Sequence, residues 1–150
     1  MKKILTLCMA LGLIVAVTSC SKEKKLDSRL AGNTWNIDKI EWVKQELILV
    51  TEGTETNAGT FTFTENTGTS TMTIDGETVT GAEFLWDAAG DGGQINLTYS
   101  LTIEGTTTTQ RAMVIEENKK KSQTWVMTEQ RVDASTGETF QLVATLELSR

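Results

Sequence analysis

Apolar and polar residues alternate with a period of two along most of the chain after residue 33. The clearest run covers residues 95–103, where Ile, Leu, Tyr, Leu and Ile are separated by Asn, Thr, Ser and Thr. Because successive side chains of a strand point to opposite faces, this alternation predicts strands with one buried and one exposed face. Residues 140–148 repeat the pattern, and shorter alternating segments surround Trp35, Phe61, Met72, Phe84 and Trp125.

Turn signals separate these segments. Asp75-Gly76 lies between two alternating runs and predicts a two-residue hairpin turn. Residues 87–93 are rich in glycine and predict a loop. Between Ile37 and Ile40 the alternation changes phase, which predicts a bulge near Asp38-Lys39. Together these signals predict about eight strands joined by short connections.

Sequential antiparallel strands with short connections predict an all-β meander. A closed up-and-down barrel removes the exposed edges that a flat meander would have, and a two-sheet sandwich is the alternative. Residues 95–103 would span about 30 Å as one strand, and such length favours a barrel. We therefore expect a small antiparallel barrel over residues 30–150. Residues 26–31 predict one helical turn before it, with Leu26 and Leu30 on one face and Gly32 at its end.

The first 20 residues have the features of a secretion signal. Lys2 and Lys3 precede an apolar stretch at residues 4–17, which is too short to span a bilayer comfortably. The sequence Val17-Thr18-Ser19-Cys20 follows and resembles the bacterial lipobox, in which the Cys carries lipid and becomes the mature N-terminus. The resemblance implies a signal peptide at residues 1–19 and a lipidated Cys20 with a tether at residues 20–29. An ordinary signal peptide with a chance Cys is the alternative.

This assignment accounts for both cysteines. Cys8 would be removed with the signal peptide and Cys20 would be capped by lipid, so the mature chain would form no disulfide. Ser21 follows Cys20, whereas an Asp there would indicate retention in the inner membrane, so the same resemblance favours the outer membrane. Residues 22–25 are mostly basic, unlike the acidic cluster of surface-exported lipoproteins. Periplasmic or outward-facing display is left open.

Several short motifs resemble lipocalins and the lipocalin-like lipoproteins of Bacteroidota. The motifs are Gly32 before Trp35, Phe61-x-Phe63, Phe84-x-Trp86 and Trp125-x-Met127. The resemblance implies an eight-stranded barrel with room for a ligand, and a Trp that closes the barrel floor beneath an Arg from a late strand. Here two residues separate Gly32 from Trp35, where lipocalins have one. The motifs leave open whether Arg111, Arg131 or another arginine is the partner of Trp35.

The aromatic residues on the inferred inward faces are the candidate ligand contacts. A barrel of eight strands is either filled by side chains or holds one small ligand, so each of these residues could line a pocket or belong to the core. The candidates are Trp35, Phe61, Phe63, Phe84, Trp86, Tyr99, Trp125 and Phe140.

Composition excludes other classes of function. The 150 residues contain no His and carry a net charge of −6, which argues against nucleic-acid binding and removes the commonest general base and metal ligand. Without His or a mature free Cys, no Ser-His or Cys-His pair can form, so we expect no enzyme and no cofactor. Residues 87–98 match a calcium loop poorly, because Ala89 and Thr98 stand where ligands are needed, so we expect no metal.

Two hypotheses about function follow. The first is a lipid-anchored envelope protein that binds a small apolar ligand inside the barrel. The second is an interaction protein that contacts another envelope protein through its loops or its outer strand faces, as the threonine-rich outer faces and the loop at residues 87–93 would permit.

Overall fold

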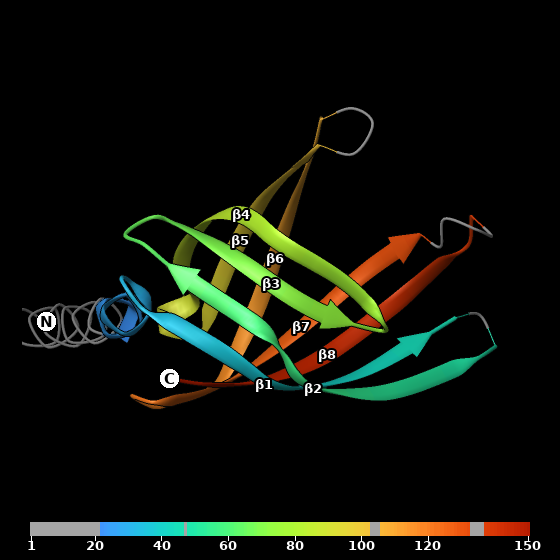
Figure 1. Cartoon of the computed structure of the whole chain (residues 1–150), viewed down its shortest axis with the longest axis horizontal. Coiled ribbons are helices and arrows are strands. Elements are labelled where there is room, and N and C mark those ends of the chain that lie inside the picture. Colours follow the sequence, from blue (N-terminus) through green and yellow to red (C-terminus); the bar gives the residue numbers. More distant parts are fainter. Residues whose placement is uncertain (1–21, 47, 103–105, 133–136) are drawn as a thin grey trace, which may run out of the picture.

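The computed structural model describes residues 22–46, 48–102, 106–132 and 137–150, and for residues 100–102 and 106–110 the backbone alone. Its eight strands form a closed barrel in which each strand pairs antiparallel with the next and β8 pairs with β1 (Figure 1). The predicted up-and-down barrel is confirmed, and the sandwich alternative is wrong. The strands are β1 (Thr34–Gln45), β2 (Val50–Phe63), β3 (Thr67–Ile74), β4 (Glu77–Ala89), β5 (Gln94–Thr102), β6 (Thr106–Asn118), β7 (Ser122–Val132) and β8 (Thr139–Ser149). The expected signal peptide and Cys20 lie outside the described residues.

The hairpin and the bulge occur where the sequence predicted them. Asp75 and Gly76 join β3 to β4 with positive φ angles of 52° and 73°, as a type I′ turn requires. The register of β1 shifts between Ile37 and Lys39 against both β2 and β8. This bulge lets Ile37 and Ile40, three residues apart, both face the interior.

The loop predicted at residues 87–93 is shorter than expected. Asp87 and Ala88 still pair with β5, and β4 ends at Ala89. A single 3-10 turn at Gly90–Gly92 then makes the connection. β4 continues through Asp87, Ala88 and Ala89 because each of these residues pairs in register with a residue of β5, the last with Gln94. The glycines that follow did not by themselves determine where the strand ends.

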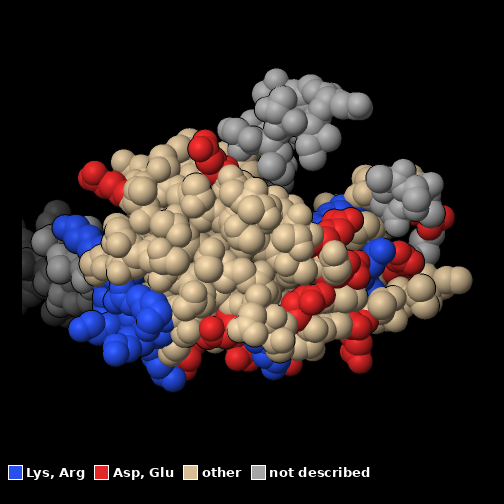
Figure 2. Space-filling model, in the orientation of Figure 1, with Lys and Arg blue, Asp and Glu red and all other residues tan. Residues whose placement is uncertain are grey.

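The N-terminal helix is longer than the single turn predicted at residues 26–31. Residues 22–30 are helical, so the lysines expected in a tether belong to the helix. Leu26 and Leu30 are one turn apart and both 0% exposed, which gives the helix an apolar face to bury on the barrel. Gly32, with a φ of 72°, follows its end. The helix lies at the end of the barrel where β1 begins, and lysine and arginine side chains gather there (Figures 1 and 2).

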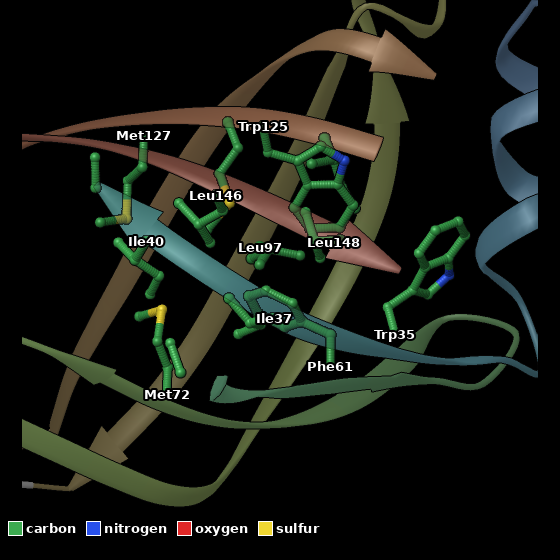
Figure 3. Packing of buried hydrophobic residues seen from close by; sticks show 14 of the residues in the cluster. Trp35, Ile37, Ile40, Phe61, Met72, Leu97, Trp125, Met127, Leu146 and Leu148 are labelled. Carbon is green, nitrogen blue, oxygen red and sulfur yellow. The ribbon is translucent and has the colours of Figure 1, made fainter. Parts of the chain in front are cut away.

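The inward faces of all eight strands meet in one core. Side chains from opposite walls of the barrel, such as Ile37 on β1 and Leu97 on β5, are at most 1% exposed and point toward one another (Figure 3). Their neighbours along each strand face solvent, as alternation requires. Among the described residues, no helix is long and apolar enough to cross a membrane.

Candidate ligand-binding site

Exposure along the inward rows of side chains shows which end of the barrel is closed. On β7, Trp125 and Met127 are 0% exposed, whereas the side chains of Glu129 and Arg131 on the same face are 11% and 24% exposed. On β6, Met113 is 0% exposed and the side chain of Arg111 is 16% exposed. We call the end that carries the helix the closed end. The opposite end, where β1 connects to β2 and β3 to β4, is the mouth.

A chain of hydrogen bonds holds the helix on the closed end. Trp125 Nε1 donates to Gln123 Oε1 at 2.7 Å, and Gln123 Nε2 donates to Asn118 Oδ1 at 3.0 Å. Arg29 Nη1 on the helix donates to the same Asn118 oxygen at 2.6 Å. These bonds pair the polar groups of Trp125 and Gln123, which would otherwise be buried unsatisfied.

Arg150 is the arginine that covers Trp35. Its guanidinium carbon lies 5.1 Å from the centre of the Trp35 ring, within cation–π range. Its Nε donates to the Lys120 carbonyl at 2.9 Å and its Nη1 to the Arg29 carbonyl at 3.2 Å. The resemblance implied an arginine from a late strand at this place. Arg111 and Arg131, which were left open as alternatives, lie toward the mouth instead.

Six of the eight candidate aromatics form one connected cluster: Phe61, Phe63, Phe84, Trp86, Tyr99 and Trp125. The centres of contacting rings are 5.3 to 6.1 Å apart. Trp35, the cross-strand partner of Phe61, is not part of these ring contacts and lies beneath Arg150 at the closed end. Phe140 is half-buried toward the mouth, where Lys44 Nζ lies 4.4 Å from the centre of its ring. Seven of the eight are thus buried side chains, and their contact with a ligand stays a prediction.

The inward face toward the mouth carries a charged cluster that the sequence analysis missed. Glu129 forms ion pairs with Arg111 and with Arg131, the second at 2.8 Å. Two guanidinium groups thus share one carboxylate, so these three residues together carry one formal positive charge. The alternation at Trp125-x-Met127-x-Glu129-x-Arg131 contained the signal, because it places both charges on the inward face.

Tyr99 joins the aromatic cluster to this charged cluster. Its ring contacts Phe84 and lies 5.1 Å from the Arg111 guanidinium carbon. Its hydroxyl is 3.3 Å from the Ser70 hydroxyl. Burial raises the pKa of Tyr99 above its usual value of 10.0, so the phenol stays a neutral hydrogen-bonding group at physiological pH.

Cavities open on the outer surface of the barrel among the described residues. One, of about 300 Å³, lies over β2 to β5 among threonines and the exposed Leu85. Another, of about 600 Å³, crosses β1, β2 and β8 near Val43 and Val143. In the part of the chain that the structure describes, no group of three potential metal-ligating side chains comes together. Asp87, from the glycine-rich segment, instead accepts a hydrogen bond from Asn96 at 3.0 Å.

The described residues define a closed eight-stranded up-and-down barrel. The chain is similar to a lipocalin-like protein from Bacteroides uniformis ATCC 8492 whose crystal structure is solved. The two share 13% sequence identity with a TM-score of 0.43 over 81% of this chain and 98% of the other. No protein-family model matches the chain, and no curated protein matches it significantly.

Proposed function

We propose that this protein is a lipid-anchored binding protein of the bacterial outer membrane. Its ligand is a small molecule with an apolar body and one anionic group, bound at the mouth of the barrel. The observation that carries the proposal is the unequal charge of the mouth cluster, where Arg111 and Arg131 share Glu129 beside the aromatic core. An unbalanced charge in a partly buried place is costly, and an anionic ligand would balance it.

The chemistry of the mouth suggests how such a ligand is held. Arg131 keeps 24% of its side chain exposed, so its guanidinium is accessible from solvent. Guanidinium groups bind carboxylate, sulfonate or phosphate through paired hydrogen bonds. The half-buried Phe140 offers aromatic surface for the apolar part. The chain enters the described structure at Lys22, at the closed end, so an anchor at Cys20 leaves the mouth free.

Two fluorescent probes that share one ring system test the proposal. 1-Anilinonaphthalene-8-sulfonate carries an anionic group, and N-phenyl-1-naphthylamine is its neutral counterpart. We expect a chain starting at Ser21 to bind the anionic probe more tightly, and Arg131→Gln to weaken that binding about tenfold, which corresponds to one charge-assisted hydrogen bond. The neutral probe should bind both chains equally. Lys39→Gln makes the same change of charge on the outer side of β1 and should change neither affinity.

Arg111 needs a paired variant because its removal alone leaves Glu129 without its close partner. Arg111→Gln combined with Glu129→Gln removes both charges and keeps the side-chain volumes similar. If each probe binds every variant as tightly as it binds the unaltered chain, the anionic part of the proposal is wrong. If neither probe binds the unaltered chain, the mouth is not a binding site for ligands of this class.

A second candidate function is docking to another envelope protein, and exposed apolar side chains favour it. Ile48 and Leu49 in the connection from β1 to β2 are 101% and 55% exposed, and Val50 at the start of β2 is 62% exposed. Apolar surface of this kind is typical of protein interfaces. Crosslinking in cells with a photoreactive residue at position 48 tests it, with position 77 on the exposed β3–β4 hairpin as control. A chain that crosslinks to nothing from position 48 contradicts this candidate.

A further inference from the structure

The closed end of the barrel carries most of the positive charge of an acidic protein. Eight of the 14 Lys and Arg residues lie there, although the net charge of the chain is −6. We call them the basic face: Lys22, Lys24, Lys25, Arg29, Lys119, Lys120, Lys121 and Arg150. Figure 2 shows lysine and arginine side chains gathered beside the helix, with acidic side chains spread along the rest of this view.

Contacts of Arg150 bring the two parts of the basic face together. Its side chain donates to the carbonyl of Arg29 on the helix and to the carbonyl of Lys120 in the connection between β6 and β7. Its backbone N–H donates to the Lys121 carbonyl at 3.1 Å. The helix lysines and the connection lysines therefore lie on one side of the fold, held by hydrogen bonds.

Most of these charges face solvent without a neutralising partner. Within the described residues, Lys119 is the lysine of this face that pairs with a carboxylate, Glu117, at 2.6 Å. Lys22, Lys24, Lys25, Lys120 and Lys121 are exposed and have no carboxylate within ion-pair distance among those residues. Five unpaired charges close together repel one another, so the face is preorganised for an extended anionic surface.

Basic and acidic side chains lie on different sides of the helix. Lys22, Lys25 and Arg29 follow the spacing of one helix face, and Arg29 turns toward Asn118 beside the connection lysines. Glu23 and Asp27 lie on the opposite flank, where burial and the charges of Glu23 and Asp87 raise the pKa of Asp27. The acidic side chains of the helix are therefore directed away from Lys22, Lys25 and Arg29.

We propose that the basic face docks on a bilayer surface of anionic phospholipid. Positive charge on the protein complements the negative charge of the headgroups, and each Lys near such a surface contributes about 1 kcal/mol, a factor of about five in affinity. The place where the chain enters the fold supports this occupant, because Lys22 belongs to the face and Cys20 is two residues before it. Docking would hold the barrel upright with its mouth toward the aqueous phase. The inference goes beyond ligand binding and does not require that Cys20 is lipidated.

Sedimentation with vesicles tests the docking. The probe is a chain starting at Ser21, which contains the closed barrel, the helix and every contact described here but no lipid attachment site. We expect it to sediment with vesicles of equal parts phosphatidylcholine and phosphatidylglycerol but not with phosphatidylcholine alone. An ionic strength of about 1 M, where the Debye length is about 3 Å, should release it.

Matched variants assign the binding to the basic face. Lys120→Gln with Lys121→Gln should weaken binding about 25-fold, since two charges are lost. Gln45→Glu with Gln130→Glu makes the same change in net charge at exposed positions toward the mouth and should weaken it far less. Equal losses in the two pairs, equal binding to neutral vesicles, or no binding at all would overturn the proposal. Because probe binding at the mouth is measured without vesicles, failure here leaves the proposed ligand site untouched.

Discussion

Arg150 lies over the indole ring of Trp35, with 5.1 Å between its guanidinium carbon and the ring centre. Trp35 is near the start of β1 and Arg150 follows β8, so this contact joins the first and last strands where they pair to close the barrel. Trp35 is 0% exposed, and its indole N–H has no hydrogen-bond partner among the described residues. Among the described residues, the contacts that stabilise the Trp35 side chain are therefore the Arg150 cation and apolar packing, without a hydrogen bond from the indole N–H.

Removal of this contact should loosen the closed end. We expect Arg150→Ala to lower the free energy of unfolding by about 2 kcal/mol, from one cation–π contact and the hydrogen bonds to the Lys120 and Arg29 carbonyls. Urea denaturation measures the change. Lys119→Ala, the same loss of charge at an exposed neighbour, is the control and should cost less than about 0.5 kcal/mol. Equal unfolding midpoints for the two variants would show that Arg150 does not stabilise the floor.

The barrel could be predicted because its chemistry is local. Alternation along each strand determines which side chains face inward, and it correctly assigned Leu97, Trp125 and Leu146 to the interior. The Asp75-Gly76 turn and the phase change after Ile37 added the hairpin and the bulge. These features depend on neighbours within a few residues, so a single sequence is enough to find them.

The charged and capping groups could not be predicted because they depend on distant segments. Arg150 is fixed over Trp35 by carbonyls of the helix and of the β6–β7 connection, which are far from it in sequence. Glu129 and Arg131 continue the inward row, but near the end of a strand such residues usually face solvent. Only the pairing of β6 with β7 brings Arg111 to Glu129 and shows that the mouth is charged.

Gly68 on β3 should be intolerant of any side chain. A Cβ there would lie closer than van der Waals contact to the Phe84 ring and to the Thr62 carbonyl oxygen. We expect Gly68→Ala to destabilise the fold by about 2 to 3 kcal/mol through overpacking. In a Phe84→Leu background the same change should cost less, because the smaller side chain gives way, and a double-mutant cycle in urea measures this coupling. If the free-energy costs of Gly68→Ala and Phe84→Leu were simply additive, the strain would come from the contact with the Thr62 carbonyl oxygen and not from the Phe84 ring.

Gly76→Ala is the control for that experiment. A Cβ at Gly76 meets open space, and its φ of 73° is the source of strain. We expect a cost of about 1 to 2 kcal/mol from the left-handed conformation, unchanged by Phe84→Leu. If Phe84→Leu reduced the cost of Gly→Ala at both glycines, the double-mutant cycle would be reporting a general loss of stability and not a contact between position 68 and Phe84.

Asp27 should make the fold less stable as pH rises. Partial burial, with the charges of Glu23 and Asp87, raises its pKa in the folded state above the usual 3.8. The folded state then binds more protons at Asp27 than the unfolded state does between these two pKa values. The contribution of Asp27 to stability is therefore greatest below pH 3.8 and falls as pH rises through the folded pKa.

Asp27→Asn removes this dependence. We expect it to raise the free energy of unfolding at neutral pH by up to about 0.5 kcal/mol and to have no effect well below pH 3.8. Urea midpoints at several pH values give the profile. Glu52→Gln, at an exposed carboxylate on β2, is the control. A gain that is the same at every pH would come from helix propensity and not from the charge of Asp27.

Lipid attachment at Cys20 is tested by metabolic labelling with palmitate. Cys20→Ala should abolish labelling completely, because the thiol that would carry the diacylglycerol is gone, whereas Cys8→Ala changes the same residue type within residues 1–19 and should leave labelling intact. Fractionation alone would mislead, since an uncleaved apolar segment or the basic face could keep the protein on membranes. A wash at high ionic strength releases attachment through charge, whereas two or three acyl chains, at about 0.8 kcal/mol per buried methylene, resist it. Labelling that persists in Cys20→Ala contradicts the anchor and leaves the basic face as the membrane contact that the described residues support.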